Sequence, residues 1–139
     1  TPMAGAVGVA VHEYIQRNGL MENVKALQGY LWEQLQNLSR YRIVGDIRGK
    51  GFMLGMEFVR DRQSKEPFPC AEPGYAAGVV SKKAMNNGLV LYPGSGSVDG
   101  HHGDHVLIAP PFIISKEEID ELIARFDRTL QDAQSELLA

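Results

Sequence analysis

The sequence contains little cysteine, no excess of positive charge and no long apolar run. Cys70 is its only cysteine, which excludes an internal disulfide and suits the reducing cytosol. Lysine and arginine together number 14 against 17 aspartates and glutamates, so no basic field is available to attract nucleic acid or anionic lipid. The apolar run MAGAVGVAV at residues 3–11 is too short to span a bilayer. We therefore expect a cytoplasmic protein that binds neither nucleic acid nor a membrane.

An initiating methionine is also missing, and a helix of small residues follows Thr1 at once. We therefore expect the sequence to come from the middle of a longer polypeptide. What is present suits one globular domain, because 139 residues with 44% hydrophobic and 22% charged side chains are enough to bury a core.

Two helices are predicted at the start of the chain. Thr1 and Pro2 favour a helix that begins there, because proline fits the first helical position and threonine can cap it. Gly5 and Gly8 weaken this helix, so we expect another element to approach its small glycine and alanine residues closely. Asn18-Gly19 ends it. A second, amphipathic helix follows, with its apolar stripe at Leu20, Val24, Leu27, Leu31, Leu35 and Leu38.

A hairpin is predicted in the middle of the chain. Runs rich in β-branched and aromatic residues lie at 43–47 and 52–59. The residues Arg48, Gly49 and Gly51 between them predict a glycine turn that joins two antiparallel strands.

Short elements are predicted for the second half of the chain. In order they are a surface loop at 61–74, a helix at 76–86 and strands at 89–93 and 105–112 joined by a glycine-rich loop. Ser115 and Glu118 have the spacing of a capping box that begins a final amphipathic helix. The whole order predicts an α+β fold, a small and mostly antiparallel sheet with helices packed against it.

Three histidines gather in the motif DGHHGDH at residues 99–105. Imidazoles and carboxylates are ligands for zinc and other transition metals, and the glycines of the loop could bring His101, Asp104 and His105 together. In extended backbone, however, the adjacent His101 and His102 point to opposite faces, so both do not easily reach one ion. A polar surface loop is therefore favoured over a metal site, and no metal ligand is assigned.

The segment RGKG at residues 48–51 allows two interpretations. Its backbone amides and the Lys50 ammonium could cradle a phosphate. Its glycines match neither a dinucleotide-binding loop nor a Walker loop, and a strand follows where those motifs require a helix. A hairpin turn is favoured. Ser95 and Ser97 lack the setting of a nucleophile, so no catalytic or cofactor-binding residue is assigned.

Several motifs together resemble the carboxyl-terminal third of class III aminotransferases. They are VGDIRGKGFMLGMEFVRD at residues 44–61, KEPF at 65–68, NNGLVLYPG at 86–94 and GDHVLIAPPFIISKEEIDELI at 103–123, in that family's order and spacing. TPMAGAVGVA at residues 1–10 resembles the start of the helix that links the two domains of these enzymes. The resemblance covers nearly the whole chain.

The resemblance implies the aspartate aminotransferase fold and a pyridoxal-phosphate enzyme that moves an amino group from an amine or ω-amino acid to a keto acid such as pyruvate. Residues 1–139 resemble the small carboxyl-terminal domain of a homodimer, and residues 1–19 resemble its interdomain helix. In this family the Schiff-base lysine and the cofactor-binding groups lie in a large domain, which would precede Thr1. We therefore expect no catalytic residue, no bound cofactor and no activity in this chain alone.

The resemblance also implies which residues face the substrate. His101, His102 and Asp104 are candidates for the mouth of the substrate channel. Leu107 stands where ornithine-type members carry a carboxylate-binding arginine, and Gly100 stands where some amine:pyruvate members carry a mobile arginine. Neither position therefore supplies the charge that binds an α-carboxylate in those enzymes.

Two hypotheses from different classes follow. The chain is either part of a class III transaminase or a noncatalytic module, such as a truncated product, a proteolytic fragment or an assembly domain. The coding sequence upstream of Thr1 distinguishes them.

Overall fold

The structure is a computed structural model that describes residues 1–69 and 73–139, so Cys70 lies outside the described residues. The elements in chain order are α1 (Pro2–Arg17), α2 (Leu20–Asn37), a 3₁₀ turn (Leu38–Arg40), β1 (Val44–Lys50), β2 (Met53–Phe58), α3 (Tyr75–Asn86), β3 (Tyr92–Gly94), β4 (His105–Ile108) and α4 (Lys116–Leu137). None of the helices described is long and apolar enough to cross a membrane.

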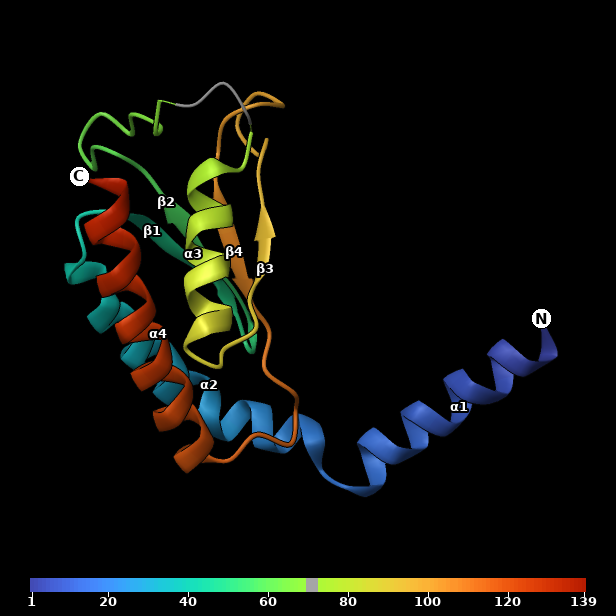
Figure 1. The fold of residues 1–139 in the computed structure, drawn as a ribbon. Coiled ribbons are helices and arrows are strands. Elements are labelled where there is room, and N and C mark those ends of the chain that lie inside the picture. Colours follow the sequence, from blue (N-terminus) through green and yellow to red (C-terminus); the bar gives the residue numbers. More distant parts are fainter. Residues whose placement is uncertain (70–72) are drawn as a thin grey trace.

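Four antiparallel strands form one sheet in the order β1-β2-β4-β3. Helices α2, α3 and α4 pack on one face of it (Figure 1), and the core between them holds the fully buried Leu31, Val80 and Phe126 of the helices. The opposite face stays open, since Met53 and Tyr92 on it are 70% and 72% exposed. The expected α+β fold is confirmed.

The β1–β2 hairpin turns later than the sequence predicts. Lys50 pairs with Met53, so the turn consists of only two residues, Gly51 and Phe52. Gly51 has a φ of 60°, which fits the glycine-first turns that match the twist of paired strands. Arg48 and Gly49 were expected in the turn and instead belong to β1. That part of the prediction is wrong, because the two-residue turn lets the hydrogen-bonded pairing of β1 with β2 continue as far as Lys50 and Met53.

The strands of the second half are shorter than predicted. Strand β4 ends at Ile108 rather than at residue 112, because Pro110 and the proline after it have no N–H to donate to a neighbouring strand. Strand β3 begins at Tyr92, and the preceding Leu91 is buried without pairing in the ladder. The segment before β3 and the segment after β4 are therefore not paired, and they separate beneath α4.

Helix α1 extends away from the rest of the chain (Figure 1), and none of its residues is buried. The side chain of Thr1 makes no capping hydrogen bond, whereas Pro2 occupies the first turn as expected. A Cβ added at Gly5 or Gly8 would meet nothing within 4 Å. The element expected to approach these small residues is therefore not found among the described parts of this chain.

The capping box of α4 is confirmed. The Ser115 hydroxyl accepts from the Glu118 N–H at 3.2 Å, and the Glu118 carboxylate accepts from the Ser115 N–H at 2.8 Å. Both bonds satisfy amide groups that would otherwise lack partners at the helix start. They fix the direction of α4, whose Ile119, Phe126 and Leu130 are completely buried against the sheet.

Candidate functional site

The loop between β3 and β4 is organised by Asp99. Its Oδ1 accepts from the backbone N–H groups of His101 and His102, at 2.9 and 2.7 Å, and its Oδ2 lies 2.6 Å from His102 Nδ1. The hydrogen bond to His102 is the largest reason why the pKa of Asp99 falls far below its usual range. The two histidine rings meet edge to face, with their centroids 5.0 Å apart, and both residues are exposed.

The histidines of this loop do not converge on one point. His105 Nδ1 donates to the carbonyl oxygen of Gly103 at 2.9 Å, and its other ring nitrogen, Nε2, lies beside Gly94. His102 is held instead by Asp99. Among the described residues, no group of three histidine, cysteine or carboxylate side chains could hold a metal ion. That the loop binds no metal ion when the protein is in solution remains a prediction.

Asp104 connects this loop to α3. Its carboxylate accepts from the backbone N–H groups of Gly74, Ala76 and Ala77, at 3.1, 2.6 and 3.2 Å. The N-cap residue that precedes α3, Gly74, has no side chain that could cap the helix, so a carboxylate distant in sequence takes that role. Asp104 therefore fixes the start of α3 against β4.

The three channel candidates lie close together. His101, His102 and Asp104 line one hollow of about 20 Å³, beside Phe58 and Tyr75. That volume is sufficient for about one water molecule and far too small for a substrate. Their assignment to a substrate channel stays a prediction.

A larger hollow, of about 270 Å³, lies on the open face of the sheet above Gly55. We call it the Gly55 hollow, and its main lining residues are Arg48, Met53, Gly55, Glu57, His105 and Leu107. Strand register explains this grouping. Arg48, Gly55 and Leu107 form one row across three strands, while Glu57 and His105 belong to the next row on the same face. Alternation along each strand shows only which residues share a face, so these rows could not be found before the register of the strands was known.

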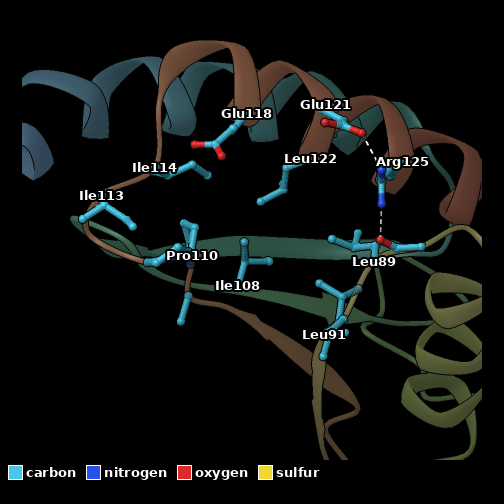
Figure 2. Close-up of a pocket in the computed structure, with 14 residues that line it drawn as sticks. Leu89, Leu91, Ile108, Pro110, Ile113, Ile114, Glu118, Glu121, Leu122 and Arg125 are labelled. Atoms are coloured by element: carbon cyan, nitrogen blue, oxygen red, sulfur yellow. Dashed lines mark hydrogen bonds and ion pairs between the residues drawn. The ribbon is translucent and has the colours of Figure 1, made fainter.

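The cavity shown in Figure 2, of about 530 Å³, lies where β3 and β4 separate below α4. Leu91, Ile108 and Leu122 form much of its apolar wall. The charged groups at its edge satisfy one another, since Arg125 donates both to Glu121 and to the carbonyl oxygen of Gly88 (Figure 2). This arrangement stabilises the packing of α4, and the other charged residue of the described lining, Glu118, belongs to the capping box.

The lysines are not arranged for covalent chemistry. Lys65 donates to the carbonyl oxygen of Gly45 and pairs with Glu57, and Lys83 pairs with Glu136, which raises the pKa of the lysine. Lys116 lies over the ring of Tyr30 at 4.6 Å. No lysine lines any of the five hollows described for residues 1–69 and 73–139.

The fold and these motifs together define a piece of an aminotransferase. The model of the family described as aminotransferase class-III matches residues 1–130, and the chain belongs to that family. A similar relative is an uncharacterized aminotransferase of Schizosaccharomyces pombe, 40% identical over 131 residues that make up 93% of this chain and 28% of that protein.

Solved structures agree with this assignment. A Bacillus anthracis aminotransferase is 30% identical and superimposes with a TM-score of 0.80, over 94% of this chain and 28% of that one. A thermostable omega transaminase mutant from Pseudomonas jessenii is 27% identical, with a TM-score of 0.76, over 90% of this chain and 26% of its own. The chain thus spans little more than a quarter of the length of these proteins.

Proposed function

We propose that residues 1–139 form the carboxyl-terminal small domain of a pyridoxal-phosphate-dependent transaminase, with residues 1–19 as its interdomain helix. The proposed reaction transfers an amino group from an amine or ω-amino acid to a keto acid such as pyruvate. The observation that carries this proposal is the family match over residues 1–130, combined with coverage of only 28% of the first relative. Most of the enzyme's groups would then lie in a large domain that precedes Thr1.

The described residues do not fit the cofactor that the family implies. Pyridoxal phosphate needs a lysine amine in a desolvated pocket, a carboxylate for its ring nitrogen and donors for its phosphate. The lysines described above are paired, stacked on an aromatic ring or outside the hollows. We therefore assign the chemistry to the upstream domain, and the chain alone is expected to be inactive.

Two features support the other parts of the proposal. The open face of the sheet and the bare α1 offer two surfaces on which an upstream domain and a second subunit could pack, in keeping with a homodimer. The single cysteine of the sequence suits a cytoplasmic enzyme. Small-molecule amines and keto acids are the proposed substrates, and the similarity to an omega transaminase favours this class.

A noncatalytic module is the second candidate, favoured by the lack of a fitting lysine in the described chain. Native protein captured with an antibody against α4 distinguishes the two candidates by intact mass and by a transamination assay with an amine donor and pyruvate. The transaminase proposal predicts a polypeptide much longer than 139 residues that transfers the amino group. A native polypeptide that consists of these residues alone and has no activity would instead establish the module.

A further inference from the structure

The strands contain glycine at positions 45, 49, 55 and 94, and three of these glycines are required by close neighbours. An added Cβ would lie 2.9 Å from Val59 at Gly45, 2.3 Å from the Met53 carbonyl oxygen at Gly49, and 2.5 Å from His105 Nε2 at Gly94. Gly55 differs from them. The atoms nearest to its added Cβ are 3.9 Å away, and its φ is not positive.

Gly55 therefore has no reason within the described chain to be glycine. It lies inside β2, which pairs with a strand on each side, where glycine weakens a sheet because it offers no side chain to pack and loses more entropy on folding. Glycine inside a strand often marks a place where a ligand or another backbone approaches closely. The space that it leaves free is the Gly55 hollow, of about 270 Å³.

The two neighbours of Gly55 across the sheet differ in chemistry. Arg48 lies directly opposite it on β1, and Leu107 lies directly opposite it on β4. Arg48 supplies the only arginine or lysine of the described lining. Its guanidinium is 2.8 Å from Asp46, but both side chains are largely exposed, and such pairs exchange partners at little cost. A planar guanidinium beside an apolar wall suits a carboxylate with a short hydrocarbon tail.

The other end of the hollow holds a carboxylate that already has a partner. Glu57 is paired with Lys65 at 3.3 Å, and only 15% of its side chain is exposed. It faces the same side of the sheet as its cross-strand neighbour His105. A second carboxylate on the ligand would approach Glu57, which already has its partner and offers no donor to another carboxylate. The hollow therefore suits monocarboxylates and disfavours dicarboxylates.

We propose that the Gly55 hollow binds the carboxylate of a small monocarboxylic substrate through Arg48, with the hydrocarbon tail of that substrate against Met53 and Leu107. The inference rests on the proposed function, in which a keto acid is one of the two substrates. Arg48 would give the chain a part in substrate selection without any catalytic group.

The test is a titration of the isotopically labelled chain, followed by amide chemical shifts in NMR spectra, with sodium butyrate as the probe. We expect saturable shifts at Gly55, Leu107 and His105, with a dissociation constant on the order of 1–10 mM for a small and open site. Acetate should bind at least about threefold more weakly, because it lacks two methylene groups. Succinate, which carries a second carboxylate, should also bind more weakly than butyrate.

Two variants and one control assign the shifts to the site. Arg48→Gln should weaken butyrate binding about tenfold, the usual loss for a charge-assisted hydrogen bond. Gly55→Val should abolish binding and keep the fold, because its side chain enters free space in a conformation that suits a strand. Lys50→Gln is the control, since it removes a cation of the same strand that does not line the hollow.

Butyrate shifts that are absent, that persist unchanged in Arg48→Gln, or that phosphate or butylamine reproduces at equal strength would overturn the inference. None of these results bears on whether a longer native protein transaminates, because the readout is binding to this chain. The activity assay on native protein tests that separately.

Discussion

Asp104 offers the sharpest test of how the site region is built. Its carboxylate accepts three backbone N–H groups at the start of α3, although it lies 27 to 30 residues away in sequence. Replacing it with alanine removes both acceptor oxygens and therefore all three hydrogen bonds. Replacing it with asparagine keeps one oxygen but removes the negative charge that the positive end of the helix favours. The two variants therefore separate the effect of charge from the effect of hydrogen bonding.

The expected magnitude follows from the capping role. Loss of a capping side chain costs about 0.5–2 kcal/mol of unfolding free energy, and loss of a favourable charge at a helix start costs about 0.3–1 kcal/mol. We expect about 1–2 kcal/mol for Asp104→Asn and more for Asp104→Ala. For a chain of this size the asparagine variant should lower Tm by about 3–8 °C.

Two measurements check this expectation. Urea denaturation gives the change in unfolding free energy, with Glu33→Gln as the control, because that exposed glutamate loses the same charge and makes no hydrogen bond among the described residues. Amide hydrogen exchange should show faster exchange at Ala76 and Ala77 in particular. If both Asp104 variants match wild type in stability and exchange, the capping role is wrong.

Three further predictions concern the remaining surfaces. After dialysis, the untagged chain should hold well under one zinc ion per chain, and H101A and H105A should not change that content. One zinc ion per chain in wild type that is lost in both variants would show that the loop is a metal site. The isolated chain should self-associate through the exposed side of α1, as measured by sedimentation velocity. Val7→Lys should reduce this association more than the control Val90→Lys. A clean monomer at every concentration would refute the prediction. Burial is the largest cause that raises the pKa of Tyr41 above its usual 10.0, and the hydrogen bond to Asp127 is the next. The neutral Tyr41 hydroxyl therefore stabilises the fold fully below pH 10.0, and this stabilisation is lost as the pH rises through the raised pKa. Denaturation from pH 8 to 11 should therefore show the advantage of wild type over Tyr41→Phe shrinking, and a constant difference would contradict the assignment.

Local signals in the sequence were enough to predict most of the fold. The Ser115 and Glu118 pair marks the start of α4 because both partners lie within one turn, and their hydrogen bonds depend on nothing else. The hairpin was also predicted, but its turn was placed too early. A run with several glycines does not show which of them must adopt a positive φ until the register of Lys50 with Met53 is known.

The site depended on contacts between distant residues. The family resemblance made Asp104 a candidate for the mouth of the substrate channel, which stays a prediction. Its contacts with the start of α3 had no local signal, because the helix begins at Tyr75, far away in the sequence. The sequence did not distinguish Gly55 from the other three strand glycines. Only the structure shows that close neighbours explain those three and leave Gly55 without such an explanation. Alternation predicts which face a strand residue occupies, but it does not predict which side chains from other strands meet it.

The most direct test of the account is to locate the lysine that holds pyridoxal phosphate in the protein isolated from its natural source. Borohydride reduction fixes the cofactor to that lysine, and peptide mass spectrometry then identifies the position. The account predicts one labelled lysine in sequence that precedes Thr1, with none of Lys25, Lys50, Lys65, Lys82, Lys83 and Lys116 labelled. Stoichiometric labelling of one of these six, Lys50 above all, together with amine-dependent conversion of the cofactor, would show that the chemistry resides in this chain and contradict the account.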